Sequence, residues 1–265
     1  QYCGGVPVRV PTKAEDRFAM QPDVIESLIT PRTKAIMVNS PNNPTGEVYS
    51  DEQLAAIAAI AEKHDLLVIS DEVYNTLLYT GAKFRSIAEL PGMKARTVVV
   101  NSFSKSYAMT GWRIGYTASP LNAAKAMTNF QSHSTSCPNS IAQYAAMKAL
   151  QGDPQCVTDM VAQFEARRNA MVEKINSIPG LSCMKPQGAF YIMLNITGVM
   201  GKTYNGRVID SSQTFAELLL ADKHVAVVPG NAFEAEGFCR LSYAVAMESC
   251  MEGLRRIEEF VSELK

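Results

Sequence analysis

The sequence lacks the features that mark membrane-spanning, secreted and nucleic-acid-binding proteins. No apolar run approaches the ~20 residues needed to span a bilayer, and the first residues carry no basic stretch followed by a signal-like apolar core. The 25 basic and 26 acidic residues are well mixed and leave a formal charge of -1. The sequence therefore shows no basic surface for nucleic acid or for an anionic membrane. We expect a cytoplasmic protein that acts on small molecules.

Histidine and cysteine are few and scattered. The cysteines are Cys3, Cys137, Cys156, Cys183, Cys239 and Cys250. They form no Cys-x-x-Cys pair and stand at no spacing from a histidine that suggests a zinc site, so we expect reduced, mostly buried thiols and no bound metal. We expect the three histidines, His64, His133 and His224, at the surface or at helix ends rather than as catalytic bases.

What the chain does contain is enough apolar material for two lobes, with 47% hydrophobic residues in a length of 265. Four short segments rich in Val and Ile, bounded by turn residues, predict strands buried on both faces: 35–39, 66–70, 97–102 and 114–119. A helical pattern over 51–65 follows a Ser50-Asp51 start signal and lies between the first two segments. Strand, helix and strand in this order predict a parallel sheet.

The second half of the chain has a different pattern. Helical spacing over 122–152 is interrupted by a loop-forming composition at 134–139, and a long amphipathic stretch follows at 155–178. Beyond it we predict strands at 189–196, 225–228 and 238–244, and helices at 212–222 and 247–264. We therefore expect an α/β fold with a mostly parallel sheet domain over 1–160 and a smaller α+β domain over 161–265, with the boundary inside the long helix.

Lys105 lies in the segment 102–115, Ser-Phe-Ser-Lys-Ser-Tyr-Ala-Met-Thr-Gly-Trp-Arg-Ile-Gly, directly after an apolar strand. An aldehyde cofactor with a phosphate tail needs an anchor for the tail and an amine that holds the aldehyde carbon as an imine. Pyridoxal phosphate is the obvious candidate. Arg113 can grip two phosphate oxygens, and Ser102 and Ser104 could offer hydroxyls from the same face of an extended segment. The alternative is a polar loop that joins two strands.

Asp71 follows the apolar strand Leu-Leu-Val-Ile-Ser, at the carboxyl end where ligands of open α/β sheets bind. Its carboxylate could pair with the cofactor's pyridine nitrogen and keep it protonated. Tyr74, three residues on, could donate to the ring's phenolic oxygen. The alternatives are a helix N-cap for Asp71 and an ordinary core aromatic for Tyr74.

Asn43 and Arg240 are the candidates for contact with substrate. Asn43 lies in Ser-Pro-Asn-Asn-Pro-Thr-Gly, where two prolines and a glycine could hold its amide rigidly toward the cofactor's phenolate oxygen or a substrate carboxylate. Arg240 lies in the strand-like Phe-Cys-Arg-Leu-Ser-Tyr-Ala and could clamp a carboxylate with two hydrogen bonds. The alternatives are a plain turn for Asn43 and an edge-strand residue that faces water for Arg240.

These segments together resemble the fold-type I, class I and II aminotransferases, and most closely the bacterial aspartate-aminotransferase-like branch. Four motifs carry the resemblance, in the order of the family: SPNNPTG, SDEVY, SFSKSYAMTGWRIGY and FCRLSYA. The match extends over essentially the whole chain, and SFSKSYAMTGWR is its most specific part. The resemblance implies a transaminase that depends on pyridoxal 5′-phosphate (PLP).

The resemblance also implies a role for each candidate residue. Lys105 is then the internal-aldimine lysine, which shuttles a proton between the substrate's α-carbon and the cofactor's C4′ atom. The cofactor contacts are Asn43, Asp71, Tyr74, Ser102, Ser104, Lys105 and Arg113, and Arg240 with Asn43 binds the substrate's α-carboxylate. The reaction is a ping-pong transfer from an L-amino acid to a 2-oxo acid, with aspartate-like substrates, in a homodimer.

The same resemblance implies that the amino-terminal part of the family is missing, because the segment that begins at Gln1 resembles one well inside the larger domain. Without that part we expect weaker cofactor binding and an exposed apolar sheet or subunit-interface surface. Two alternatives stay open. One is a carbon-sulfur lyase or decarboxylase of the same fold that uses the same lysine, and the other is a non-catalytic remnant that carries no cofactor.

Overall fold

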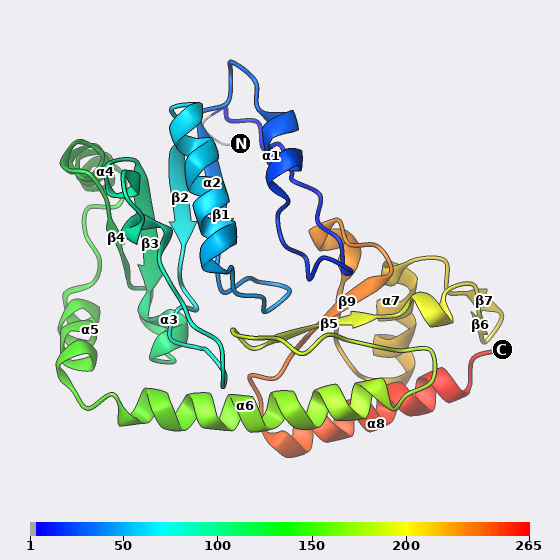
Figure 1. Ribbon diagram of the computed structural model, residues 1–265. Helices are drawn as coiled ribbons and strands as arrows, with labels where there is room; N and C mark the ends of the chain where they lie inside the picture. The colour runs from blue at the N-terminus through cyan, green and yellow to red at the C-terminus, as the bar shows by residue number, and fades with distance from the viewer. Residues whose placement is uncertain (1–3) are drawn as a thin grey trace. The chain divides into compact units, whose positions relative to one another are not determined.

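The chain divides into two compact units in the computed structural model, which describes residues 4–265 (Figure 1). Unit 1 comprises the described residues up to Pro41 together with Glu47–Val157, and unit 2 comprises Asn42–Gly46 and Thr158–Lys265. The segment Asn42–Gly46 therefore belongs to unit 2, although both of its chain neighbours belong to unit 1. Gln1 and Cys3, which were named in the sequence analysis, lie outside the described residues.

Unit 1 contains a four-stranded sheet in the order β1-β2-β3-β4. Its strands are β1 (Ala35–Asn39), β2 (Leu67–Asp71), β3 (Thr97–Ser102) and β4 (Gly115–Ala118). The first three strands are parallel, and β4 runs antiparallel to β3. The mostly parallel sheet predicted from the sequence is confirmed. Since parallel strands end at the same edge, the polar residues that end β1, β2 and β3 gather there.

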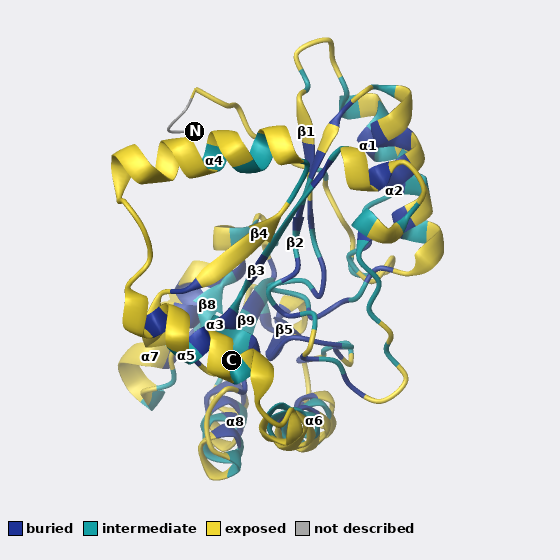
Figure 2. Ribbon diagram, turned by 90° about the vertical axis from the view of Figure 1, so that its left-hand side faces the viewer, coloured by how far each residue is buried: buried dark blue, intermediate teal, exposed yellow. Residues whose placement is uncertain are grey.

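The helices α1 (Pro22–Leu28) and α2 (Asp51–Lys63) lie on one side of this sheet (Figure 2). The predicted start of α2 is confirmed: the Ser50 hydroxyl accepts from the Gln53 backbone N–H, and the Gln53 side chain accepts from the Ser50 N–H in return. This capping box satisfies two backbone donors at the start of α2. The buried side of α2 shares one core with alternate residues of β1 and β2, and its members include Leu54, Ile57, Val38 and Val68.

The other side of the sheet is largely open. Met37 and Leu67 are 66% and 53% exposed, and every residue of β4 is exposed. The prediction that all four strands are buried on both faces is therefore wrong, because among residues 4–265 helices cover only one face of β1 and β2. The expectation of an exposed apolar sheet surface is confirmed.

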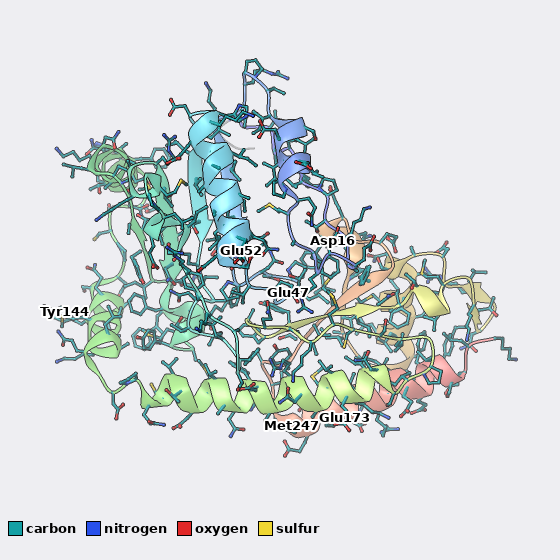
Figure 3. All side chains as sticks on the ribbon, in the orientation of Figure 1. Asp16, Glu47, Glu52, Tyr144, Glu173 and Met247 are labelled. Atoms are coloured by element: carbon teal, nitrogen blue, oxygen red, sulfur yellow. The ribbon has the colours of Figure 1, made fainter. Side chains whose placement is uncertain are left out.

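Two helices follow β4 with little burial of their own. The helix α4 (Leu121–Ser134) has no buried residue, and α5 (Ser140–Gln151) buries Ala142 and Ala146 (Figure 2). Tyr144 on α5 is 69% exposed and points away from the unit (Figure 3). The remaining short helices of unit 1 are α3 (Phe103–Ser106), η1 (Ile87–Glu89), η2 (Met93–Ala95) and η3 (Thr110–Trp112).

Unit 2 has the α+β composition expected from the sequence. Its antiparallel sheet has the order β5-β9-β8, formed by β5 (Tyr191–Asn195), β9 (Phe238–Ser242) and β8 (Val228–Pro229). The helices are α6 (Gln155–Asn176), α7 (Ser212–Lys223) and α8 (Met247–Ser262), with the short turns η4 (Thr197–Val199) and η5 (Gly230–Phe233). A two-stranded ribbon, β6 (Thr203–Tyr204) with β7 (Arg207–Val208), was not predicted, because strands of two residues show no periodicity.

The histidines lie where the sequence predicted them. His64 and His224 end α2 and α7, and His133 lies in the last turn of α4. His64 Nε2 lies 2.6 Å from Glu26 Oε1, which also accepts from the Lys63 ammonium at 2.6 Å. These contacts are surface pairs at the end of a helix rather than a catalytic arrangement.

The expectation of mostly buried thiols is wrong. Of the five described cysteines, all free, Cys239 and Cys250 are buried, Cys183 is half-buried, and Cys137 and Cys156 are exposed. The exposed pair flanks α5, outside both cores. Residues 4–265 contain no cluster of three or more His, Cys, Asp or Glu able to hold a metal ion. They also contain no helix with the length and apolarity to cross a membrane.

Candidate active site

The carboxyl edge of the unit 1 sheet carries most of the candidate residues. Asp71 is the last residue of β2 and Ser102 the last residue of β3. Asp71 stands beside Asn39 of β1 and beside Val100 of β3. The helix α3, which contains Lys105, follows at once where β3 ends (Figure 1). Parallel pairing thus brings Asp71 and the Lys105 segment to one edge, although 34 positions separate them in the sequence.

Asp71 is held by its backbone and keeps part of its carboxylate open. Its carbonyl oxygen accepts from Asn39 Nδ2 at 3.1 Å and from the Ser40 N–H at 3.1 Å. Carboxylate Oδ1 accepts from the Val73 N–H at 3.2 Å, and no side chain among residues 4–265 donates to Oδ2. The residues after Asp71 form turns rather than a helix, so the helix N-cap alternative is wrong.

The residue after Asp71, Glu72, is a buried carboxyl that the sequence analysis missed. It is 4% exposed, and its Oε1 accepts from the Ser70 hydroxyl at 2.9 Å and from the Ser86 hydroxyl at 2.5 Å. Burial raises the pKa of Glu72, and the two hydroxyls only partly oppose that effect. The serine two positions before Glu72, in the segment Ser-Asp-Glu, is a signal that could have marked it, whereas Ser86 lies 14 residues away. Glu72 therefore ties the end of β2 to the turn that contains Ser86.

The side chain of Lys105 emerges from a single helical turn. The Ser102 hydroxyl caps this turn by accepting from the Ser104 N–H at 3.0 Å, and it lies 2.9 Å from the Ser104 hydroxyl. Phe103 and Ser106 are buried, and Lys105 is half-buried. The predicted extended segment is wrong, since Ser104 is helical, but the cap still brings the two serine hydroxyls together.

Arg113 and Tyr74 are the remaining candidate residues in unit 1. Arg113 follows η3 with its backbone in the left-handed region (φ 50°), and its Nη1 donates to the Thr110 carbonyl at 2.8 Å. This residue is exposed, and a second guanidinium nitrogen is left for an anion. Tyr74 is 3% exposed, as a core aromatic would be, and its contact with the cofactor stays a prediction.

Unit 2 contains Asn43 and Arg240, and they are in direct contact. Arg240 Nη1 donates to Asn43 Oδ1 at 2.9 Å. Arg240 lies on β9, the central strand of its sheet, so the edge-strand alternative is wrong. The guanidinium carbon lies 4.6 Å from the centre of the Tyr191 ring and 5.1 Å from the centre of the Phe233 ring. Contacts with two aromatic faces stabilise the cation and orient its plane.

Neither aromatic residue was identified from the sequence. Met193 pairs with Arg240 across β5 and β9, and Tyr191 stands two positions before Met193. Residues two apart on a strand share a face, so a correct pairing of these strands would have pointed to Tyr191. Phe233 comes from η5, and no pattern in the sequence places it near Arg240. We refer to Asn43, Tyr191, Phe233 and Arg240 as the Arg240 group.

The loop that supplies Asn43 is held on both sides. The Asn42 side-chain oxygen accepts from the Thr45 N–H at 3.2 Å and from its hydroxyl at 2.9 Å. The Gly46 carbonyl accepts from the N–H groups of Gln187 and Gly188 at 2.9 and 2.8 Å. Gly46 has φ +72°, and a Cβ there would lie 2.5 Å from the Cβ of Pro186. This position therefore requires glycine, because the backbone of the loop packs closely against 186–188.

The residues of unit 1 fit a cofactor with a phosphate, an aldehyde and a basic ring nitrogen. Asp71 offers an open carboxylate oxygen for a protonated ring nitrogen, and Lys105 offers an amine for the aldehyde. The paired hydroxyls of Ser102 and Ser104 and the exposed guanidinium of Arg113 are donors for phosphate oxygens. Unit 1 therefore contains an acceptor for the ring nitrogen, an amine for the aldehyde and donors for the phosphate.

Comparison with known proteins gives a consistent result. A family model described as aminotransferase class I and II matches residues 1–257. The aspartate aminotransferase of Geobacillus stearothermophilus is 46% identical over 262 residues, which cover 98% of this chain and 66% of the relative. The aromatic-amino-acid aminotransferase 2 of Thermococcus litoralis is 43% identical over 269 residues, with 99% and 66% covered.

Solved structures give the same correspondence. The crystal structure of an aspartate aminotransferase from Rhizobium meliloti matches with a TM-score of 0.96 and 40% sequence identity, over 99% of this chain and 66% of that one. The chain thus spans 66% of the length of the relatives that it matches. Over that length its fold and theirs coincide.

Proposed function

Because this chain belongs to the class I and II aminotransferases, we propose that it carries the lysine and the carboxylate-binding arginine of a PLP-dependent transaminase. The reaction moves an amino group from an L-amino acid to a 2-oxo acid in two half-reactions, by a ping-pong mechanism. One observation supports this proposal most strongly: an open carboxylate and a lysine on a capped turn share the carboxyl edge of one parallel sheet.

The unit 1 residues bind and orient the cofactor in this proposal. When bound, PLP supplies an electron sink that stabilises negative charge on the substrate's α-carbon. Asp71 accepts a hydrogen bond from the protonated ring nitrogen and keeps the proton there. The Ser102 and Ser104 hydroxyls and the Arg113 guanidinium hold the phosphate. Tyr74 would donate to the ring's phenolic oxygen.

Lys105 has two tasks. Its amine would hold the aldehyde carbon of a bound cofactor and would give up that position to the substrate's amino group. The freed amine would then take the proton from the substrate's α-carbon and deliver it to the C4′ atom. A half-buried lysine on a fixed turn suits both tasks, because proton transfer requires a constrained distance.

Arg240 binds the α-carboxylate of the amino acid. Its fork can donate two parallel hydrogen bonds to the two carboxylate oxygens, and the rings of Tyr191 and Phe233 keep the fork in one plane. Asn43, already bonded to the same guanidinium, restricts its rotation further. The Arg240 group is thus a preformed carboxylate site.

We propose aspartate-like amino acids as donors. The support is the name and 46% identity of the Geobacillus stearothermophilus relative, against 43% for the relative named for aromatic amino acids. We also propose a homodimer, in which the 134–139 loop reaches the partner's site. The exposed apolar side chains of α4 and α5, such as Phe130, Ile141 and Tyr144, are suited to a subunit contact.

The test is covalent capture of the cofactor. The protein is mixed with PLP, reduced with borohydride, digested and analysed by mass spectrometry, alongside Lys105→Ala and the control Lys148→Ala. We expect one adduct on Lys105 in the native protein and in the Lys148 variant, since Lys148 is an exposed residue of α5. Equal labelling of the Lys105 variant would refute the role of Lys105.

A product assay distinguishes transamination from other reactions of the same lysine. With L-aspartate as donor, amino-group transfer predicts a new 2-oxo acid together with a newly aminated acceptor, in equal amounts. Release of ammonia with pyruvate, or of carbon dioxide, without an aminated acceptor would contradict transamination and favour a lyase or a decarboxylase.

A further inference from the structure

A hydrogen bond between two hydroxyls joins the two segments that supply Asp71 and Lys105. The Thr76 hydroxyl donates to the hydroxyl of Ser106 at 2.8 Å. Ser106 is the residue after Lys105, and Thr76 lies five residues after Asp71. Ser106 is 3% exposed, whereas Thr76 is an exposed residue. None of the four sequence motifs marks this contact, because Thr76 lies beyond the end of SDEVY.

The helix α3 depends on such contacts because it has only four residues. A single helical turn is not stable by itself, since the cost of fixing its backbone exceeds the gain from one or two hydrogen bonds. Its first residues are fixed by the Ser102 cap and by Phe103, whose N–H donates to the Ile114 carbonyl at 3.3 Å. At its last residue, Ser106, the bond to Thr76 is the side-chain contact that fixes the turn.

Thr76 is in turn fixed with respect to Asp71. The Asn75 N–H donates to the Glu72 carbonyl at 3.0 Å, and the Leu77 N–H donates to the Tyr74 carbonyl at 2.9 Å. These two turns lead directly from the end of β2 to Thr76. The hydroxyl pair therefore works as a cross-link between the Asp71 segment and the last residue of α3.

We propose that Thr76 and Ser106 are positioning residues that hold the Lys105 amine at a fixed separation from the Asp71 carboxylate. This inference rests on the proposed function, in which one planar ring must reach Asp71 with its nitrogen and Lys105 with its aldehyde carbon. Because the ring has fixed dimensions, a lysine that drifts with a loose turn meets the aldehyde less often. The hydroxyl pair acts on that encounter rather than on the affinity for the phosphate.

The experiment measures two quantities separately: the rate at which PLP reacts with Lys105 and the affinity of the protein for the cofactor. The rate of covalent capture of PLP at Lys105 is measured by borohydride trapping, and affinity is measured with pyridoxine 5′-phosphate, which has no aldehyde. For Ser106→Ala and for Thr76→Val we expect the capture rate to fall about five- to tenfold, with the affinity unchanged within about twofold. Thr76→Ser keeps the hydroxyl and should restore the native rate.

Two further measurements use the same variants. In the cofactor-free protein, the rate at which an acylating reagent labels Lys105 should change in Ser106→Ala and in Thr76→Val, and it should stay native in Thr76→Ser. The double variant should be no slower in capture than either single variant, because both changes remove one bond. Thr128→Val, on the exposed side of α4, is the matched control and should behave as the native protein does.

The outcomes separate the two proposals. If the native protein captures no PLP at Lys105, the proposed function fails. If the native protein captures PLP and the Thr76→Val variant does so at the same rate, the positioning role is overturned. Equal losses of capture rate and of affinity would also overturn it, since they indicate a general structural role. Thr76 lies at the surface, so its variant remains informative even if Ser106→Ala folds poorly.

Discussion

The surroundings of Lys105 in unit 1 and the Arg240 group in unit 2 are built in different ways. Lys105 stands on one helical turn, held by hydroxyl bonds from Ser102 and Thr76 at the edge of a sheet with one open face. Arg240 stands on a central strand between two aromatic rings, bonded to a residue 197 positions away. In the proposed reaction Lys105 changes its partner and Arg240 only binds. The difference indicates that packing fixes the binding group, whereas hydrogen bonds hold the reacting one.

The largest effect is expected at Gly46, on the loop of the Arg240 group, and it tests whether packing fixes this group. A Cβ at this position meets Pro186 and the Gly188 carbonyl at 2.5 and 2.9 Å, and the backbone has a φ of +72°. We expect Gly46→Ala to lower the free energy of unfolding by about 2–4 kcal/mol, measured by urea denaturation with far-UV circular dichroism.

Gly81 provides the matched control in unit 1. It has a similar φ of +87°, but no atom lies within 4 Å of its added Cβ. Gly81→Ala should therefore cost only the backbone strain, about 1 kcal/mol. If the two variants lose the same free energy of unfolding, packing around the Asn43 loop adds no stability. That result would contradict the role of packing in fixing the Arg240 group.

A smaller effect is expected from Arg240→Lys. Lysine keeps the positive charge but has no planar fork, so it loses one of the two hydrogen bonds to a carboxylate and its fit between Tyr191 and Phe233. We expect KM for L-aspartate to rise about 10- to 100-fold with a smaller change in kcat, in steady-state assays with a 2-oxo acid as acceptor. Arg207→Lys, at an exposed ion pair of unit 2, should leave both constants unchanged. A KM that stays native in Arg240→Lys would remove Arg240 from the proposed carboxylate site.

The smallest effect concerns the buried acid of unit 1. Burial raises the pKa of Glu72 above its usual 4.5, so the folded protein binds this proton more tightly than the unfolded chain does. The resulting stability is fully present below the unfolded pKa and is lost as pH rises through the folded pKa. Relative to Glu72→Gln, we therefore expect the free energy of unfolding of the native protein to fall as the pH rises above about 4.5.

Urea denaturation at several pH values checks this prediction, with the exposed Glu15→Gln as the control for removal of one charge. A difference between native protein and Glu72→Gln that does not change with pH would mean that Glu72 titrates alike in the folded and unfolded states. A difference that grows with pH would reverse the sign and make the Ser70 and Ser86 hydroxyls the dominant influence.

Residues that act through local chain features could be identified from the sequence. Asp71 ends β2 and Lys105 lies three residues after the end of β3, and such positions lie at the ligand-binding edge of a parallel sheet whatever the details of packing. The helix start at Ser50 was predictable for the same reason, since a cap acts within three residues. The burial of both sheet faces was not, because an unalternating apolar segment has the same pattern whether or not another element covers it.

The order of the main strands and helices, the family and the choice of Lys105 as the candidate lysine could be predicted from the sequence alone, because they depend on neighbours along the chain and on motifs of several residues. Three contacts became visible only in the tertiary structure. Tyr191 and Phe233 pack against the Arg240 guanidinium, the hydroxyls of two serines donate to the buried Glu72 carboxyl, and Thr76 bonds to Ser106. Each of these contacts joins segments whose separation in sequence carries no periodic signal. They form only when strand pairing and turns bring two surfaces together, and a one-residue shift in register would remove the contact between Tyr191 and Arg240.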